Sequence, residues 1–374
     1  MAHICYLTGS YDRRDPLMFY RQGLSMAKAG HRVSLVVCDD LPDEVVDGIE
    51  IHSTRFKPKN RFEKFLKTKK ILRDFAERLD ADVYQISDPQ HISLGNYFRK
   101  KWKTVVFNMR EYYPDMLMKK PYIPKPFRGL LSWGYLKMMS HYLKKYDAVF
   151  TVTPEIVGLL EEKSKLNNVH LLTNFPIPDY SYILSKEDYM ARKNTAIYEG
   201  TIYKVSRQEV FLDALQRIPN LDYLLVGKFC EGNEDVQEHP AWNRVTFVDG
   251  FKIEELKGYF AKSTISNTLR DFGKLDGSLG VIKVFESMEA ALPVIFSDVP
   301  LYRSIVEKWH CGVLANPNDV DSVEKALRYL VEHKEEAYEM GQNGRRAVLE
   351  EYNWGEQFKT YNDVVMGLLK TKNN

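Results

Sequence analysis

The sequence of 374 residues has no apolar run of about 18 residues, the length that a helix needs to cross a bilayer. Its first residues, MAHICYLTGSYDRRD, lack the basic and then apolar segments that mark a secretion signal. The only cysteines are Cys5, Cys38, Cys230 and Cys311, which are too far apart for the pair spacing of a zinc site. We therefore expect a cytoplasmic protein with buried thiols and without disulfides.

A strong net charge is also missing, but the two halves differ in sign. The net charge is +2, while residues 1–175 carry +9 and residues 176–374 carry −7. The densest basic segments are residues 55–73, with nine Lys or Arg and one Glu, and residues 99–103. They predict contact with membrane headgroups, a lipid phosphate or nucleic acid, and a solvated helix face is the alternative. Apolar residues among the charges favour a membrane-surface element: Phe56, Phe62, Phe65, Leu66 and Trp102.

Short apolar strand patterns alternate with helical patterns along the chain, which predicts parallel sheets with right-handed crossovers. The segment 175–194 interrupts this alternation with prolines and predicts a domain boundary. We expect an α/β fold of two Rossmann-like doubly wound domains, residues 1–175 and 176–352, with a C-terminal helix at about 353–374. The expected strands are 3–8, 32–38, 47–53, 82–87, 104–109, 148–153, 169–174, 195–200, 221–227, 245–250, 264–268 and 294–296. Besides the helix within 280–300, the expected helices are 17–29, about 61–79, about 91–101, about 127–145, one that begins at Pro154, 207–217, 253–261, about 319–332 and about 335–350.

The Gly-x-Gly-x-x-Gly fingerprint of dinucleotide dehydrogenases is absent after the first strand, where Thr8, Gly9, Ser10 and Tyr11 stand. A loop of small residues lets backbone amides approach a ligand. Because ligands of open α/β sheets bind at the carboxyl ends of the strands, Gly9 and Ser10 are expected to line a cleft there. A plain strand-to-helix turn is the alternative.

The most informative segment is GVIKVFESMEAALPVIFSDVP, residues 280–300, which predicts a loop, a helix and then a buried strand. Lys283 and Glu286 fall in the first turn of that helix. A carboxylate there is able to accept two hydrogen bonds from a vicinal diol such as a ribose. Free N–H groups at a helix N-terminus, with a lysine nearby, suit a diphosphate. The segment therefore predicts a nucleotide site, and a solvated Lys–Glu pair is the alternative.

This segment resembles the donor-site helix of retaining glycosyltransferases of the GT-B fold, family 4. Lys283 and Glu286 match the Lys-x-x-Glu pattern of that helix, which continues with a small residue, a proline and a strand ending in Ser-Asp. Two positions depart from the pattern, because Ser278 replaces an upstream glutamate and Val281 replaces a proline. The resemblance implies two facing domains, a final helix that crosses back to the first domain, and a donor ribose held by Glu286.

The segments 80–90 and 108–125 resemble a bacterial branch of the same superfamily that acts on cell-surface polysaccharides. Arg110 replaces a histidine that faces the donor sugar in relatives. An arginine stays charged and cannot act as a base, but it is able to neutralise a phosphate or hold a carboxylated sugar. Asp88 and Glu111 are the acidic candidates on the acceptor side, with loop capping as the alternative. The implied catalytic set is Arg110, Glu111, Asp88 and Lys283.

The second half supplies further donor-site candidates by the same resemblance. Relatives place a basic residue six or seven positions after a glycine that ends a strand, and Gly200 is followed here by Lys204 and Arg207. Either cation would neutralise the leaving diphosphate, whose charge grows as the glycosidic bond breaks. A plain surface cation is the alternative, and it is favoured for Lys204. The remaining candidates come from loops: Gly227, Phe251, which would flank the base or only pack, Gly277 and Ser278.

These features predict a retaining, hexosyltransferase-like enzyme that moves a sugar from a nucleoside diphosphate donor to a hydroxyl of a glycan or polyprenyl-linked glycan acceptor in surface polysaccharide synthesis. In relatives the leaving phosphate helps to deprotonate the attacking hydroxyl. No Asp-x-Asp follows a strand where it would hold a metal, so we expect neither a metal nor a cofactor. Beyond donor and acceptor, the expected partner is an anionic membrane surface at 55–73 and 99–103, which would make the protein peripheral at the inner face of the membrane.

Three alternatives remain at this point. A non-catalytic GT-B protein that binds a partner or a nucleotide sugar is motivated by Ser278 and Arg110. A nucleotide-sugar epimerase of the same fold is disfavoured, because Gln85 and Ser87 replace two histidines of the branch and acid–base chemistry needs groups that titrate near neutral pH. A nucleic-acid role is the weakest alternative, because the second half of the chain is acidic.

Overall fold

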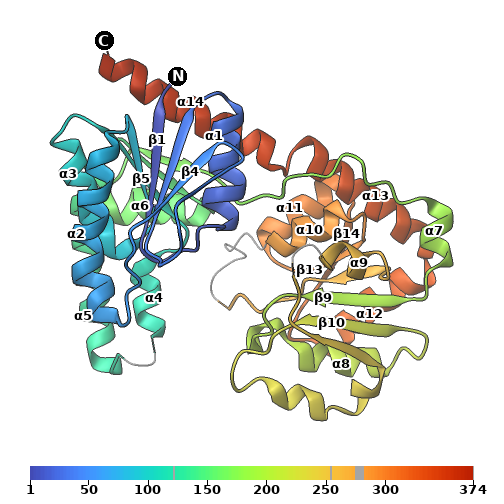
Figure 1. Ribbon diagram of the computed structural model, residues 1–374. Helices are drawn as coiled ribbons and strands as arrows, with labels where there is room; N and C mark the ends of the chain where they lie inside the picture. Colours follow the sequence, from blue (N-terminus) through green and yellow to red (C-terminus); the bar gives the residue numbers. More distant parts are fainter. Residues whose placement is uncertain (121–122, 253–254, 274–281, 374) are drawn as a thin grey trace. The chain divides into compact units, whose positions relative to one another are not determined.

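The computed structural model describes residues 1–120, 123–252, 255–273 and 282–373 (Figure 1). The chain divides into two compact units, each built on one sheet. The first unit joins Met1–Asn174 to Trp354–Asn374, and the second is Phe175–Asn353.

The first unit contains eight strands: β1 (His3–Thr8), β2 (Arg32–Val37), β3 (Glu44–Val46), β4 (Ile49–Ser53), β5 (Val83–Ile86), β6 (Thr104–Met109), β7 (Ala148–Thr151) and β8 (Val169–Leu171). Their order in the sheet is β3-β4-β2-β1-β5-β6-β7-β8. Every neighbouring pair is parallel except the edge strand β3, which is antiparallel to β4. The chain winds outwards in both directions from the pair β1 and β5, so the topological switch point lies between these two strands.

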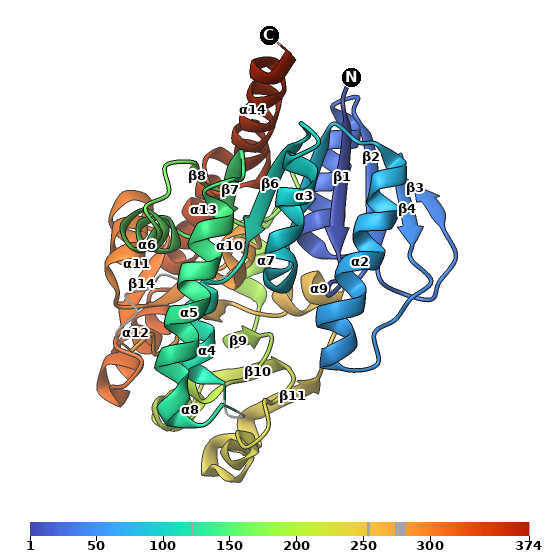
Figure 2. The same cartoon turned by 90° about the vertical axis from the view of Figure 1, so that its left-hand side faces the viewer.

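The helices of the first unit are α1 (Leu24–Lys28), α2 (Arg61–Leu79), α3 (Gly95–Arg99), α4 (Tyr113–Lys119), α5 (Lys125–Leu143), α6 (Pro154–Ser164) and α14 (Trp354–Asn373). Figure 2 shows α2, α3 and α5 in front of the same face of the sheet. Leu72 of α2, Phe98 of α3 and Met139 of α5 belong to one buried apolar cluster. Met26 of α1 and Tyr361 of α14 belong to another, whose strand residues point to the opposite face.

The C-terminal helix α14 crosses back to the first unit, as expected. The indole Nε1 of Trp354 donates to Ser25 Oγ at 2.9 Å. The Tyr361 hydroxyl donates to Gln85 Oε1 at 2.8 Å and lies 3.2 Å from the Tyr6 hydroxyl, in a buried setting. These bonds to side chains from α1, β1 and β5 attach the helix to the back of the first sheet.

The second unit contains six strands: β9 (Thr195–Glu199), β10 (Asp222–Gly227), β11 (Val245–Asp249), β12 (Ile265–Asn267), β13 (Val294–Ser297) and β14 (Gly312–Ala315). Their order is β11-β10-β9-β12-β13-β14, and every pair is parallel. This is the Rossmann order, with the switch point between β9 and β12. The helices are α7 (Lys186–Ala191), α8 (Gln208–Gln216), α9 (Leu256–Phe260), α10 (Ile282–Glu289), α11 (Pro300–Trp309), α12 (Val320–Glu332) and α13 (Lys334–Glu350).

The expected α/β architecture of two doubly wound units is confirmed, and five elements were not foreseen: β3, α4, α7, which lies within the segment 175–194 expected to be a linker, α11 and β14. The helix expected at 17–29 begins as a π-helical segment, Pro16–Gly23, and continues as α1. Four short 3-10 segments complete the described structure: Pro89–Leu94, Lys204–Ser206, Glu234–Glu238 and Pro240–Arg244.

Two expectations drawn from missing features concern membrane spans and thiols. Within the described ranges, no helix combines the length and the apolar character that crossing a membrane requires. All four cysteines are free thiols, with Cys5 and Cys311 buried and the other two half-buried. Burial raises the pKa of the Cys38 thiol to about 11 and that of Cys311 to about 12, so both stay protonated at neutral pH.

Candidate functional site

The first turn of α10 meets the carboxyl end of β9 in the second unit. The Lys283 ammonium donates to the Tyr198 hydroxyl at 3.1 Å and lies 4.3 Å from the centroid of the same ring. Its nitrogen is also 3.8 Å from Oε2 of Glu199, which is too long for a hydrogen bond. Tyr198 and Glu199 are the last two residues of β9, so the lysine predicted to hold a diphosphate stands at the edge where ligands of such sheets bind.

Glu199 is the member of this cluster that the sequence analysis missed. It is 5% exposed, and its Oε1 makes no hydrogen bond within the described part of the chain. Burial raises its pKa to about 8, and the opposing effect of the Lys283 charge does not offset burial. Glu199 therefore keeps its proton at neutral pH, and the 3.8 Å contact is then not an ion pair. Consequently, Glu199 does not neutralise the positive charge of Lys283.

Two glycines keep the backbone beside Lys283 open. Gly200 has φ +98°, and a Cβ there would lie 2.7 Å from the Lys283 Nζ. Gly227 has φ +153°, and a Cβ there would lie 1.9 Å from the carbonyl oxygen of Gly200. Any side chain at either position would strain the backbone and collide with its neighbour. The loops after β9 and β10 therefore require glycine for their close approach to each other and to the lysine.

Glu286 lies one turn further along α10 and lines a cavity of about 160 Å³. Leu256 and Phe260 of α9 provide apolar lining, and Glu289 and Arg345 provide polar lining. Burial raises the pKa of Glu289, whose Oε1 accepts a hydrogen bond from a linker amide. The Glu286 carboxyl group thus borders a small cavity that has both apolar and polar walls.

Phe251 follows β11 and is partly buried. It packs against the apolar cluster that contains Leu256 and Phe260. The structure therefore assigns it a packing contact, and its role in flanking a base stays a prediction. The loop positions Gly277 and Ser278 lie outside the described residues.

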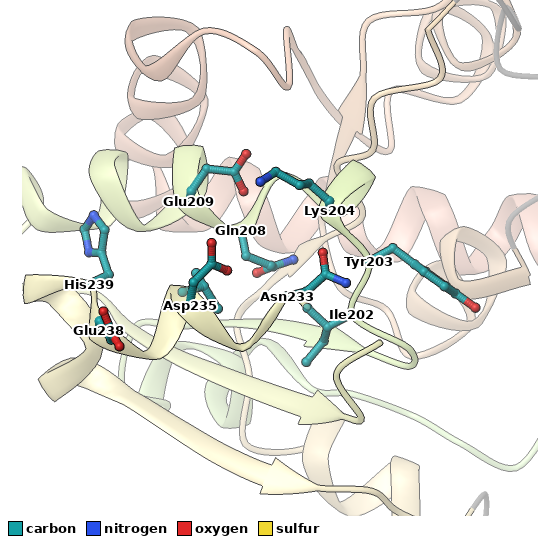
Figure 3. Close-up of a pocket in the computed structure, with 10 residues that line it drawn as sticks. Ile202, Tyr203, Lys204, Gln208, Glu209, Asn233, Asp235, Glu238 and His239 are labelled. Carbon is teal, nitrogen blue, oxygen red and sulfur yellow. The ribbon is translucent and has the colours of Figure 1, made fainter. Parts of the chain in front are cut away.

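The two basic residues that follow Gly200 have other surroundings. Arg207 has a positive φ of 49° and forms ion pairs with Glu209 at 3.1 Å and Asp271 at 3.3 Å. Lys204 lines a second cavity, of about 340 Å³, whose walls come from the start of α8 and from the segment 233–239 (Figure 3). A diphosphate would have to compete with two carboxylates for Arg207, whereas the contact of Lys283 with Glu199 is longer, at 3.8 Å.

In the first unit, Arg110 follows β6 and is held by Asp15. Its Nη1 and Nη2 donate to the Asp15 carboxylate at 2.8 and 2.6 Å, and its guanidinium lies 3.9 Å from the Tyr11 ring centroid. Asp15 also caps the segment Pro16–Gly23 by accepting from the amides of Leu17 and Met18. Burial alone would raise the pKa of Asp15, but the Arg110 hydrogen bonds and charge, with the two amides, lower it. Arg110 and Asp15 thus form a buried, ionised pair, which we name the Arg110 clasp.

The acidic candidates of the first unit differ in exposure. Asp88 is fully buried, and its Oδ2 accepts from the Gly9 amide at 2.7 Å. Gln90 Nε2 donates to Ser10 Oγ at 2.6 Å and to Asp88 Oδ1 at 3.3 Å, so these residues tie the loops after β1 and β5 together. Glu111 is exposed. Asp88 does not cap the segment after its own strand, as the alternative expected, but binds the loop after β1. Catalytic roles for Asp88 and Glu111 stay predictions.

Among the described residues, no three His, Cys, Asp or Glu side chains are close enough together to hold a metal ion. Metal independence stays a prediction, since residues 274–281 are not described.

Comparison with known proteins gives one family and a set of solved structures. Residues 185–347 match the family model for glycosyl transferases group 1. Sucrose-phosphate synthase from Thermosynechococcus elongatus matches with a TM-score of 0.72 and 18% identity over 99% of this chain and 100% of that chain. The chain has the GT-B fold. Anabaena HepE in complex with UDP and glucose matches at a TM-score of 0.67 and 14% identity, over 98% of this chain and 100% of that one.

A further match is trehalose-6-phosphate from E. coli bound with UDP-2-fluoro glucose, at a TM-score of 0.67 and 12% identity over 98% of this chain and 99% of that chain. A comparison with curated protein sequences finds no match. Identities this low establish the fold. The family match covers nearly all of the second unit, including Gly200, Glu199, Lys283 and Glu286.

Proposed function

We propose that the protein is a retaining glycosyltransferase that uses a nucleoside diphosphate sugar as donor. The observation that carries the proposal is the cluster at the carboxyl end of β9, where the positive charge of Lys283 faces a carboxyl group that is neutral at pH 7. A cation without a neutralising partner is suited to bind an incoming anion. The match of residues 185–347 to glycosyl transferases group 1 supports a diphosphate as that anion.

In this proposal the second unit binds the donor. Lys283 and the N-terminal amides of α10 bind the diphosphate, and Gly200 and Gly227 leave room for it beside the lysine. Glu286 accepts two hydrogen bonds from the ribose hydroxyls, and the base packs on the apolar wall formed by Leu256 and Phe260. UDP is the first nucleotide to test, because solved structures of the same fold hold UDP or a UDP sugar.

The proposed chemistry follows from the growth of negative charge on the leaving diphosphate. Lys283 stabilises that charge as the glycosidic bond breaks, and this lowers the barrier more than it strengthens ground-state binding. The leaving phosphate accepts the proton of the attacking hydroxyl on the same face of the sugar, which retains the configuration. No step in this scheme needs a metal.

The proposed acceptor is a hydroxyl of a glycan or a lipid-linked glycan in surface polysaccharide synthesis. The proposed location is cytoplasmic, with peripheral contact at the inner face of the membrane through the basic segments 55–73 and 99–103. The first segment contains most of the helix α2, whose described residues Lys67 and Lys70 are exposed, and the second contains Trp102, which is 88% exposed. The side chains of Phe62, Phe65 and Leu66 lie outside the described residues.

A thermal-shift panel of nucleoside diphosphates and nucleotide sugars tests the donor site. A nucleotide that binds the folded state raises the melting temperature by mass action. We expect nucleotides that carry one particular base to raise the melting temperature of the wild type. This rise should be lost in Glu286→Ala. It should remain in the control Glu307→Ala, which removes a carboxylate from α11. If no diphosphate or sugar nucleotide stabilises the wild type, the proposal fails. Repeating the panel with EDTA tests metal independence, and NMR of the anomeric proton of the product tests retention.

A second candidate, a nucleotide-sugar-binding protein without transferase activity, is favoured by the Arg110 clasp. Arg110 stands where relatives carry a histidine, and both of its terminal nitrogens are bonded to Asp15. Saturable binding of a nucleotide sugar without release of free nucleotide over several hours would favour this candidate. Donor hydrolysis or transfer that is lost in Lys283→Gln would exclude it.

A further inference from the structure

The first half of α5 exposes large apolar side chains to solvent. Phe127, Leu130, Leu131 and Trp133 are 58%, 64%, 49% and 59% exposed. Large apolar side chains this exposed are uncommon as a contiguous group on a protein that has no partner there. The second half of the helix is different, since Leu143 is fully buried in the core of the first unit.

The exposed residues form a stripe that does not face the sheet. Phe127, Leu130, Leu131 and Met138 follow the spacing of three, four and seven residues that places side chains on one side of a helix. Met139 is fully buried, so the helix has one apolar side on the core and another on solvent. We name the second side, from Phe127 to Met138, the outer face of α5.

The outer face is held in a defined position. Arg128 Nε donates to the carbonyl oxygen of Ile123 at 2.8 Å, and its Nη1 donates to that of Met118 at 3.3 Å. Ser132 Oγ donates to the carbonyl oxygen of Pro114 at 2.8 Å. These bonds fasten α5 to α4, which ends in Met118 and Lys119, and Met118 is itself 45% exposed. The apolar stripe is therefore presented by two helices that are bonded to each other.

The stretch of chain that carries this face is basic. From Met116 to Tyr146 the chain contains no Asp or Glu. The same stretch contains seven basic residues: Lys119, Lys120, Lys125, Arg128, Lys137, Lys144 and Lys145. Asp115, in the first turn of α4, is an acidic residue near this stretch. An apolar stripe with more cations than anions beside it complements a surface that is apolar inside and anionic at its boundary.

We propose that the outer face of α5 docks on the surface of an anionic lipid bilayer. The apolar side chains enter the boundary between headgroups and acyl chains, with Trp133 at the level that indole rings prefer. The surrounding lysines stay at the headgroups and attract the anionic lipids. This docking surface is distinct from the basic segments 55–73 and 99–103, and it does not depend on glycosyltransferase activity.

Vesicle sedimentation tests the proposal. Wild-type protein is mixed with vesicles of phosphatidylcholine alone or with vesicles that also contain about 30% phosphatidylglycerol. The salt concentration is kept at about 50 mM, which is low enough to limit screening of the charges. We expect binding to the anionic vesicles only, and at least a fivefold loss of bound protein in Phe127→Ser/Leu130→Ser/Leu131→Ser. Ile183→Ser, which alters a residue that is 85% exposed in the second unit, is the matched control and should bind like the wild type. If the wild type ignores anionic vesicles, or the triple variant binds them equally well, the proposal is wrong.

Two further measurements keep the test decisive if the triple variant folds poorly. Brominated lipid quenches the fluorescence of tryptophans that enter the bilayer. We expect less quenching in Trp133→Phe, which keeps an aromatic ring, than in the wild type. Trp102→Phe should still be quenched. Lys125→Gln/Lys137→Gln should weaken binding several-fold at low salt and less at high salt. Equal quenching in wild type and Trp133→Phe would overturn the assignment. A dimer that the triple variant abolishes, without vesicle binding by wild type, would instead assign the face to a second copy of the chain.

Discussion

Asp15 in the first unit and Glu199 in the second are both buried carboxyl groups near a cation, yet their protonation states are opposite. Their exposures are nearly the same, 6% and 5%. Asp15 accepts from two amides and from both terminal nitrogens of Arg110. Among the residues that the structure describes, Oε1 of Glu199 finds no hydrogen-bond partner, and the Lys283 nitrogen is 3.8 Å from its Oε2. For Asp15, the hydrogen bonds and charge of Arg110, with the two amides, offset burial and lower the pKa, whereas for Glu199 burial outweighs the charge of Lys283 and raises the pKa.

The two pairs also differ in what they leave for a ligand. The Asp15 pair neutralises Arg110, which then serves to hold the segment after β1 to the end of β6. The Glu199 pair leaves Lys283 positive within a half-buried cluster. Substitutions should separate these roles. Loss of the Asp15–Arg110 pair should lower the stability of the protein, and loss of the Lys283 charge should weaken the binding of anions.

The largest expected effect comes from Asp15→Ala. The change removes a helix cap and leaves the charge of Arg110 mostly buried without a partner, which should lower the free energy of unfolding by about 3 to 5 kcal/mol. Urea unfolding followed by circular dichroism measures it. Glu50→Ala is the matched control, because its pair with Arg32 is more exposed and should contribute below about 1 kcal/mol. Equal losses in the two variants would contradict the clasp.

The next largest effect is expected from Lys283→Gln, which should weaken the binding of a nucleoside diphosphate. Removing a charge-assisted bond to a diphosphate should weaken binding of the nucleoside diphosphate about 10- to 100-fold, with a small effect on the free nucleoside. Isothermal titration calorimetry with both ligands measures the two affinities. Lys204→Gln, a cation in the other cavity, should change neither. If nucleoside and diphosphate lose affinity alike, Lys283 does not bind the phosphates.

Glu199→Gln should change the pH dependence of the free energy of unfolding, and the pH dependence that Glu199 contributes has the opposite sign to that of Asp15. Because the folded pKa of Glu199 is raised to about 8, its contribution to stability is present below the unfolded pKa and is lost as pH rises through about 8. The wild type should therefore lose up to about 1.4 kcal/mol per pH unit more than Glu199→Gln between about pH 5 and 8. Urea titrations at several pH values measure the two slopes.

The stability that Asp15 supplies should follow the reverse course. Its folded pKa is lowered, so its contribution is present above the unfolded pKa and is lost as pH falls through the folded value. Parallel slopes for wild type and Glu199→Gln between about pH 5 and 8 would mean that Glu199 is ionised in the folded protein. The comparison between the two carboxyl groups would then fail.

Helix α2 shows how much of the fold was predictable from local sequence. The expected helix at 61–79 has the observed bounds, because Asn60 caps it by accepting from the Glu63 amide at 2.9 Å. The edge strand β3 was missed because its three residues carry no periodic signal, and its pairing with β4 depends on a turn. Helix α4 was missed for a related reason, since its seven residues mix aromatic and polar side chains without a clear period.

Two residues of the site show the limit of local patterns. Asp15 precedes a proline, which is a signal for a helix cap, but nothing nearby in the sequence indicates that Arg110 binds it from 95 residues away. Glu199 ends an apolar strand immediately before a glycine, an unusual place for a charge that is visible in retrospect. Its protonation depends on burial among segments that only folding brings together.

The sequence by itself determined the alternation of strands and helices, the division into two units and the placement of Lys283 and Glu286 at a helix start, because these follow from periodicity, caps and a short motif. Only the tertiary structure decided that Arg110 is neutralised by Asp15, that the Glu199 carboxyl group beside Lys283 is protonated, and that α5 carries its apolar residues to solvent as well as to the core. Charge state and exposure depend on which distant groups surround a side chain, and local sequence does not contain those neighbours.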